Sequence, residues 1–263
     1  MRRFPHYGWS PLATDDAKPD AKSNGDAKSK KSSLVETIKA WAPAIIAVIV
    51  IRVFVFEPFK IPSASMVPTL LIGDHVVVTK FSYGLWLPFL DKEVIDFGDP
   101  ERGDIIVFEY PRNPSQAYIK RVVAIPGDVV SVSDNRITVN GELQTVQAHP
   151  DGATYEFQNE RCGTVKHNHW LETVGEVQHE MLTSPMGARL SHRDPTPIPP
   201  GEVFVMGDNR DNSEDSRSWG TVRFDQIKGK AQLVWLSVQP RNCGETNLLR
   251  QDRFFHSLYA DDE

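Results

Sequence analysis

The hydrophobic pattern divides the chain into three parts. Residues 1–33 carry few large apolar side chains and many Lys, Asp, Ser and Ala residues. Such a segment cannot bury enough surface to offset its ordering entropy, so we predict a disordered tail. Residues 34–57 contain a nearly continuous apolar run, and short β-branched segments bounded by turn residues follow from residue 58 onward. The pattern therefore predicts a membrane-spanning helix at 34–57 and one folded domain at 58–263.

The apolar run is long enough to cross a bilayer. Ala40–Phe56 is about 17 residues long, and only Pro43 and Arg52 in it are not apolar. Pro43 lies near the start of the run. Arg52 lies within about a turn of its end, where the long side chain can carry the guanidinium to the interface. Neither residue argues against a transmembrane helix.

The alternative is a cleaved secretory signal, with Ser63 and Ser65 as the small residues of the cleavage site. The preceding polar region is too long for such a signal, and Lys60 directly after the apolar run is unusual in one. Few basic residues directly follow the run, whereas four lysines precede it: Lys28, Lys30, Lys31 and Lys39. This asymmetry predicts a cytoplasmic tail at 1–33 and an extracytoplasmic domain at 58–263.

The domain after the span has the pattern of an antiparallel β protein. The predicted strands are His75–Phe81, Asp104–Tyr110, Tyr118–Ile125, Asp128–Val132, Arg136–Val139, Val203–Met206 and Ala231–Val238. Asn140–Gly141 and Pro126–Asp128 are turn signals between them. We predict a mainly β, barrel-like or Greek-key domain, in which the more polar residues 142–200 form a cap insertion.

Composition and charge exclude several function classes. The chain has 263 residues, 40% of them hydrophobic, and a net charge of −6, which gives no electrostatic footprint for nucleic acid. Cys162 and Cys243 match neither a redox pair nor a zinc pattern, so a disulfide and two buried thiols both remain open. His167 and His169 form an H-x-H pair without a third ligand at useful spacing, so we interpret them as loop surface. We expect no metal, no cofactor and no nucleotide site.

Two separate residues offer a nucleophile and a base. Ser65 lies shortly after the span, and Lys120 lies on a predicted strand between apolar neighbours. A serine hydroxyl needs a base to take its proton, and a lysine serves only if burial or a nearby cation lowers its pKa. Considered singly, Ser65 is typical of a turn residue. Lys120 alone is typical of the lysines on edge strands that prevent aggregation.

A dense polar block at Gly207–Arg217 changes this picture. A surface loop is the plain interpretation, and a calcium loop starting at Asp211 is another. The calcium pattern fails because Ser216 stands at its glycine position and Val222 at its bidentate glutamate position. A polar loop that orients catalytic groups fits the block better.

With these residues in view, the chain resembles the bacterial type I signal peptidases, which use a serine–lysine dyad. Five ordered blocks carry the resemblance: Glu57–Leu70, Gly73–Asp74, Arg102–Phe108, Tyr118–Val122 with Pro126–Asp128, and Gly207–Arg217. They extend from the membrane span almost to the C-terminus. Ala64 stands where many relatives have glycine, and the single span stands where some relatives have two.

The resemblance implies a role for each matching residue. Ser65 is expected to be the nucleophile and Lys120 the general base, while Ser213 is expected to form a hydrogen bond with the lysine amine that holds it towards Ser65. Asp215 and Arg217 resemble a supporting ion pair. The backbone N–H of Ser65 and the hydroxyl of Ser63 are expected to meet the oxyanion. Residues expected to shape substrate pockets are Phe59, Ile61, Pro62, Met66, Leu70, Tyr118 and Ile119.

The implied function is membrane-bound proteolysis. We expect a single-pass serine endopeptidase of the bacterial cytoplasmic (inner) membrane, with its catalytic domain on the periplasmic face. It is expected to act as a monomer, through an acyl-enzyme, on signal-peptide-bearing preproteins, cleaving after small residues of Ala-x-Ala type. Membrane lipid is a second expected partner, contacted by the aromatic segment Phe81–Leu90 unless that segment packs on the cap.

Three alternatives remain from the residues themselves. One is a Ser-Lys peptidase dedicated to a secretion or conjugation substrate. Another is a self-cleaving repressor, which the membrane span and the missing DNA-binding helix pair disfavour. The third is a non-enzymatic, membrane-anchored β domain that binds exported chains.

Overall fold

The computed structural model describes residues 36–46, 56–83, 85–86, 93–95, 98–159, 161–187, 192–239 and 249–259. The chain divides into two compact units, Met1–Val48 and Ile49–Glu263. In the first unit, residues 36–46 are helical. Among the residues that the structure describes, no helix is long and apolar enough to cross a membrane. The predicted tail and residues 34–35 and 47–55 of the predicted span lie outside the described residues.

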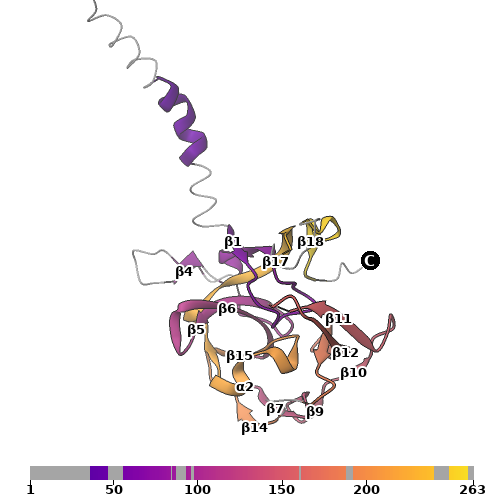
Figure 1. The fold of residues 1–263 in the computed structure, drawn as a ribbon. Helices are drawn as coiled ribbons and strands as arrows, with labels where there is room; N and C mark the ends of the chain where they lie inside the picture. Colours follow the sequence, from indigo (N-terminus) through magenta and orange to yellow (C-terminus); the bar gives the residue numbers. More distant parts are fainter. Residues whose placement is uncertain are drawn as a thin grey trace, which may run out of the picture. The chain divides into compact units, whose positions relative to one another are not determined.

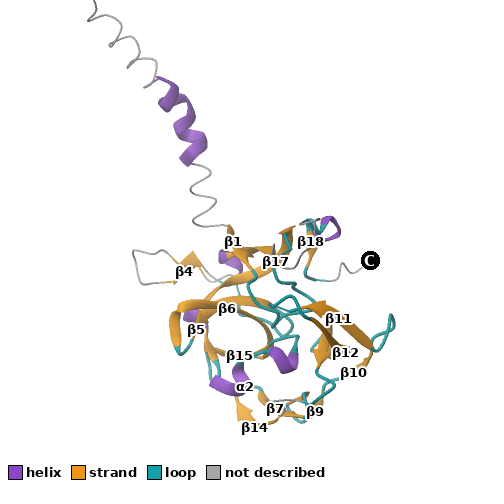
Figure 2. Cartoon of the chain, viewed as in Figure 1, coloured by secondary structure: helices purple, strands orange, loops and turns teal. Residues whose placement is uncertain are grey.

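The second unit is built mainly from antiparallel strands (Figures 1 and 2). Its largest sheet has eight strands in the order β1-β2-β17-β5-β6-β15-β16, with β18 paired to β17. The bounds are β1 Phe56–Lys60, β2 Asp74–Thr79, β5 Ile105–Tyr110, β6 Asn113–Ala124, β15 Glu202–Met206, β16 Val222–Arg223, β17 Ile227–Ser237 and β18 His256–Ser257. The predicted mainly β, antiparallel class is confirmed. Within the described part of the chain the outer strands β1 and β16 are not paired with each other, so barrel closure stays a prediction.

Smaller sheets complete this unit. One has the order β10-β12-β11 with β13 on β12, and another has the order β14-β7-β8-β9, while β3 and β4 form a separate pair. Their strands are β3 Leu85–Trp86, β4 Glu93–Ile95, β7 Val129–Ser133, β8 Arg136–Val139, β9 Glu142–Leu143, β10 Val146–Ala148, β11 Thr154–Gln158, β12 Thr164–Val174, β13 Val177–Thr183 and β14 His192–Pro197. In Figure 1, β10, β11 and β12 lie together, and β7, β9 and β14 form a second group.

Among the residues of this unit that the structure describes, helical structure is confined to short turns. The four-residue helix α2 is Ser216–Trp219, and the 3-10 turns are Lys80–Ser82, Arg210–Asn212, Phe224–Gln226 and Gln251–Arg253. Each predicted strand has a counterpart within a few residues, because β-branched runs pack well on a pleated, half-buried surface. The side chains of the aromatic segment Phe81–Leu90 lie largely outside the described residues, so the predicted lipid contact stays a prediction.

Strand β6 runs through the centre of the large sheet and is buried on both faces over its second half. Lys120 pairs with Ile106 on β5, and Arg121 pairs with Ile105. These two isoleucines belong to different hydrophobic clusters. Successive residues of a strand point to opposite faces, so Lys120 and Arg121 enter two different buried environments.

Candidate active site

The loop after β1 presents Ser65 from a buried turn. Ala64 and Met66 on either side of it are fully buried, whereas Ser65 itself is 8% exposed. Asn209 holds this turn by two bonds: its backbone N–H donates to Ser65 O at 3.1 Å, and its side-chain amide donates to Ala64 O at 3.1 Å. The polar block at residues 207–217 therefore fixes the backbone beside Ser65.

Lys120 reaches the same point from β6. Its Nζ lies 2.7 Å from Ser65 Oγ and 2.9 Å from Ile119 O, and the residue is 3% exposed. The Tyr118 ring lies 5.6 Å from the amine. The structure thus brings together the hydroxyl and the amine, which are separated by 55 positions in the sequence.

Burial changes the acidity of this amine. Removal from water disfavours the charged form and lowers the pKa of Lys120 from 10.5 to about 8, although Asp215 and Asp208 act in the opposite direction. One pH unit below its pKa, about a tenth of an amine is neutral. An amine with this pKa, next to a hydroxyl, can accept the hydroxyl proton near neutral pH.

Ser213 differs from its expected role. Its hydroxyl donates to Asp215 Oδ2 at 2.7 Å, and the hydrogen bonds of Lys120 Nζ within the described residues go to Ser65 and Ile119 instead. The carboxylate of Asp215 is the stronger acceptor, since charge-assisted bonds are stronger than neutral ones. Ser213 therefore reaches the lysine only through the electrostatic influence of Asp215.

The predicted pair of Asp215 and Arg217 is formed. Arg217 donates from Nε to Asp215 Oδ1 and from Nη2 to Oδ2, both at 2.8 Å, and Gly207 N–H donates to Oδ2 at 3.1 Å. Burial alone would raise the pKa of Asp215, but these donors, together with Ser213, outweigh burial and hold the pKa below its usual value. The carboxylate is therefore a fixed negative charge near the amine.

Gly207 is required by the close approach of two segments. A Cβ at this position would lie 2.5 Å from Ser65 O and would also collide with the side chain of Ser213. Any side chain here would push apart the two loops that meet at Ser65.

Ser63 is exposed, and its Oγ lies 3.4 Å from Ser65 Oγ. A hydroxyl at this distance from the nucleophile can rotate toward an oxygen that forms on the attacked carbon. The placement is compatible with the predicted oxyanion role.

The expected pocket residues are distributed over different environments. Phe59, Ile61, Met66, Leu70 and Ile119 belong to one hydrophobic cluster, and all except half-buried Phe59 are buried. Two further members lie elsewhere: Tyr118 stacks on Tyr110 at 4.5 Å, and Pro62 is exposed. Through Ile61, Met66 and Leu70, the loop that carries Ser65 packs into this cluster.

Sequence reasoning missed a buried ion pair on the opposite face of β6. Arg121 donates to both oxygens of Asp208, at 2.9 and 2.8 Å, and Thr69 Oγ1 donates to the same carboxylate at 2.5 Å. Burial acts to raise the pKa of Asp208, but Arg121 and His179 outweigh it and hold the pKa at about 2. Both charged residues lay inside recognised sequence blocks, but the pattern did not indicate that they pair.

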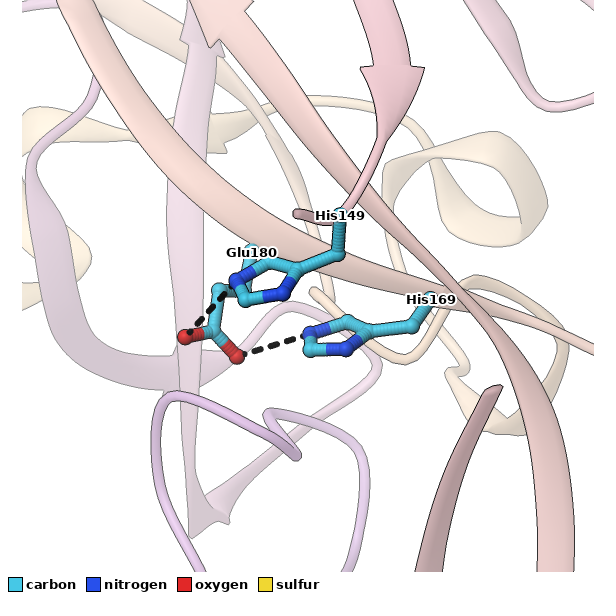
Figure 3. A group of neighbouring side chains, drawn as sticks. All are labelled: His149, His169 and Glu180. Carbon is cyan, nitrogen blue, oxygen red and sulfur yellow. Dashed lines mark hydrogen bonds and ion pairs between the residues drawn. The ribbon is translucent and has the colours of Figure 1, made fainter. Parts of the chain in front are cut away.

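The predicted loop position of the H-x-H pair is wrong. His167 and His169 lie in β12, and His169 is buried. The absence of a third ligand was judged from sequence spacing alone. In space, His169 lies with His149 and Glu180, and the candidate ligand atoms of these three residues are within 4.8 Å of one another (Figure 3). The two imidazole rings are stacked nearly parallel, with centroids 3.9 Å apart, so their lone pairs do not converge on one ion.

The structure describes one of the two cysteines. Cys162 is disulfide-bonded, which favours the disulfide over the two thiols that the sequence left open. Cys243 lies outside the described residues.

Comparison with known proteins decides the family. The sequence model of the family described as "Signal peptidase, peptidase S26" matches residues 34–236. The chain belongs to this family. It is similar to signal peptidase I of Pseudomonas fluorescens, with 44% identity over 80% of this chain and 75% of the relative. It is also similar to signal peptidase I of Pseudomonas aeruginosa, with 42% identity over 80% of this chain and 75% of the relative. Signal peptidase I of Rickettsia prowazekii is 31% identical over 91% of this chain and 100% of the relative.

Membership in the signal peptidase family has a direct consequence. The chain is an enzyme, a serine hydrolase, and the activity of its family is the removal of signal peptides from preproteins. The self-cleaving repressor and the non-enzymatic β domain are thereby excluded.

Proposed function

We propose that this chain removes signal peptides from exported preproteins by a serine–lysine dyad, with Ser65 as nucleophile and Lys120 as general base. The observation that carries the proposal is the 2.7 Å separation of Lys120 Nζ and Ser65 Oγ in a site where burial lowers the pKa of the amine to about 8. A buried amine without a carboxylate bonded to it can lose its proton without breaking an ion pair.

The reaction follows from this geometry. Neutral Lys120 takes the hydroxyl proton while Ser65 Oγ bonds to the carbonyl carbon of the scissile peptide. The peptide C–N bond then breaks, the departing amine receives that proton from Lys120, and the signal peptide remains as an ester on Ser65. A water molecule activated by Lys120 attacks the ester and releases the signal peptide.

Ser63 and the backbone N–H of Ser65 are the proposed donors to the oxyanion. Loss of one such donor costs on the order of 3 kcal/mol of transition-state stabilisation. We therefore expect Ser63→Ala to lower kcat by about 10²- to 10³-fold with KM little changed. An unchanged kcat would remove Ser63 from the mechanism.

Substrate selection is proposed to rest on shape and main-chain pairing. Phe59, Pro62 and Tyr118 are the partly buried or exposed members of the predicted pocket set, while Ile61, Met66, Leu70 and Ile119 are buried. Shallow pockets of this kind admit small side chains, which fits cleavage after Ala-x-Ala. An extended substrate gains main-chain hydrogen bonds along exposed strand edges.

We also propose that residues 34–57 anchor a monomer in the bacterial inner membrane, with the tail at 1–33 in the cytoplasm and residues 58–263 on the periplasmic face. The apolar run and the lysines before it support this arrangement. Alkaline carbonate should leave the chain in the membrane pellet, and protease added to spheroplasts should digest residues 58–263. Extraction by carbonate would contradict the anchor. Lipid contact by Phe81–Leu90 belongs to the same proposal.

The deciding experiment incubates the full chain in detergent with a preprotein that carries an Ala-x-Ala site. Ser65→Ala and Lys120→Ala should abolish cleavage. Matched controls are Ser115→Ala, an exposed serine on the same strand as Lys120, and Lys60→Ala, an exposed lysine close to the Ser65 loop. Both controls should cleave like the parent chain. Cleavage that persists in Ser65→Ala or in Lys120→Ala would eliminate the dyad.

Failure of the parent chain on this substrate, with cleavage of another exported chain, would instead favour a dedicated processing peptidase.

A further inference from the structure

Glu214 is an acidic residue next to the proposed active site that the proposed reaction does not use. It lies between Ser213 and Asp215, and unlike these two buried neighbours it is exposed. Its carboxylate Oε1 accepts a hydrogen bond from the Tyr110 hydroxyl at 3.0 Å. Among the residues that the structure describes, no lysine or arginine forms an ion pair with it. The carboxylate is therefore held in place by a neutral donor and keeps its charge.

Two stacked tyrosine rings connect Glu214 to the proposed base. Tyr110 ends β5, which lies beside β6 in the large sheet (Figure 1). Its ring stacks on the ring of Tyr118, with centroids 4.5 Å apart and planes 4° apart. The Tyr118 ring in turn lies 5.6 Å from Lys120 Nζ. The hydroxyl of Tyr110 thus places the carboxylate close to the ring that borders the amine.

The negative charge of Glu214 acts within the site. Burial raises the pKa of Tyr118, and Glu214 raises it further. Burial lowers the pKa of Lys120, and Glu214 is one of the acidic residues that oppose this change. Arg112, a basic residue in the turn between β5 and β6, donates from Nη2 to Ser218 O at 3.1 Å and not to Glu214.

The two faces of β6 indicate which part of a substrate meets this charge. Ile119 packs in the cluster that contains most of the expected pocket residues. Tyr118 and Lys120 point to the opposite face, because successive residues of a strand alternate. In the proposed reaction the departing amine receives its proton from Lys120. The chain that follows the scissile bond therefore leaves on the face that carries Glu214.

The distance is short enough for charge to matter. An extended residue spans about 3.3 Å, so the first residue after the scissile bond lies within the Debye length of roughly 8 Å at physiological salt. We propose that Glu214 is a specificity-determining residue that favours a basic side chain, and disfavours an acidic one, at the first position of the mature chain. This inference rests on the proposed function, because it requires Ser65 and Lys120 to cut at that bond.

The alternative is a solvated surface acid that has no effect on substrates. An exposed pair of charges changes an equilibrium by up to about fivefold. We therefore expect kcat/KM for a substrate with lysine at this position to be about threefold above that for glutamine, and that for glutamate about threefold below it. The ratio of kcat/KM between the lysine and glutamate substrates should then be about ten.

The test uses the full chain in detergent and three preproteins that differ only in the first residue of the mature part: lysine, glutamine or glutamate. Glu214→Gln keeps the size of the side chain and should bring the ratio between the lysine and glutamate substrates to about one to two. Glu214→Lys should invert the preference. Raising the salt from 0.1 to 1 M shortens the Debye length from about 10 to about 3 Å, so the ratio of the parent chain should also approach one.

A matched control separates this local effect from net charge. Glu109, the neighbour of Tyr110 on β5, forms an ion pair with Lys228 at 3.5 Å. Glu109→Gln changes the net charge by the same amount and should keep the ratio of the parent chain. Tyr110→Phe removes the hydroxyl that holds Glu214 and should lower the ratio part of the way.

The outcomes distinguish this inference from the proposed function. A ratio that Glu214→Gln leaves unchanged, or that Glu109→Gln lowers equally, overturns the role of Glu214. Equal cleavage of the three preproteins by the parent chain also overturns it, while the proposed function stands. Cleavage of none of the three contradicts the proposed function itself. Because Glu214 is exposed, its variants should unfold at the temperature of the parent chain, which a thermal scan checks.

Discussion

Two adjacent basic residues on β6, Lys120 and Arg121, differ in the partners that surround their charged groups. Lys120 projects to one face and Arg121 to the other, and both are at most 3% exposed. Within the described part of the chain, the acceptors of the lysine amine are both neutral, Ser65 Oγ and Ile119 O. The guanidinium of Arg121 has a carboxylate partner held by two bonds at 2.9 and 2.8 Å.

The difference in partners separates a titratable group from a fixed one. Burial lowers the pKa of Lys120 to about 8, because the opposing charges of Asp215 and Asp208 do not compensate for it fully. Burial also acts to lower the pKa of Arg121, but Asp208 outweighs it and the pKa is raised. The same strand thus supplies one cation that can lose its proton and one that holds two segments together.

The largest expected effect on cleavage comes from one of two single variants, Lys120→Arg and Arg121→Lys. Lys120→Arg keeps the positive charge but places a guanidinium, which stays protonated, where the base is needed. Cleavage should fall by on the order of 10⁴-fold or more, as for loss of a catalytic member of a triad. Arg121→Lys keeps the charge beside Asp208 and should retain cleavage within about tenfold, because neither proposed reacting atom is altered.

Lys120→Met is the control for size in this exchange. It is unbranched like lysine and removes a desolvated amine, so thermal unfolding should occur at the same or a higher temperature while cleavage is lost. Cleavage by either Lys120 variant above about a hundredth of the parent rate would contradict a base at this position.

The next effect in size concerns stability on the Arg121 face. Asp208→Asn leaves the guanidinium buried without its counter-charge, and breaking such a pair costs about 3–5 kcal/mol. Chemical denaturation in detergent should show this loss in the free energy of unfolding. The double variant Asp208→Leu, Arg121→Met removes both charges and should be more stable than Asp208→Asn. Equal instability of both variants would show that shape, not charge, decides this site.

The fold class could be predicted from the sequence because alternation and turn residues act locally. Arg136–Val139 is a strand at the predicted bounds, with Asn140 in the turn at positive φ. The internal structure of residues 142–200 could not be predicted, since its strands are polar on one face and depend on pairing with distant segments. His169 and Glu172 are examples: both are buried in β12, in a stretch whose composition predicted a cap.

The identity of the site residues could be predicted where each one lies within one of the five sequence blocks that resemble the family. Ser65, Lys120 and the pair of Asp215 and Arg217 were found in this way, and the structure brings them together. Partner choice was not predictable, because it depends on angles that the sequence does not contain. For that reason the bond from Ser213 to Asp215 was not predicted.

The pH profile gives a smaller but more specific effect. Lys120 acts when neutral, and its pKa is about 8, so kcat/KM should fall about tenfold for each pH unit below 8 and level off above it. A substrate without titratable groups near the cleavage site avoids a second limb. A flat profile between pH 6 and 8 would contradict an amine base, whatever the variants show.

The smallest expected effect tests how Ser213 acts on the titratable face. Its hydroxyl bonds to Asp215, so Ser213→Ala removes one donor, worth about 1.5–3 kcal/mol to a charged acceptor, from a carboxylate that keeps the donors Arg217 and Gly207. Cleavage should fall by less than about tenfold, with the acid limb of the pH profile nearly unmoved, and Ser213→Thr should restore it. If instead the hydroxyl holds the amine of Lys120 during the reaction, kcat should fall by at least 100-fold with KM unchanged. That outcome would show that the bond to Asp215 exchanges for a bond to the lysine when substrate is present.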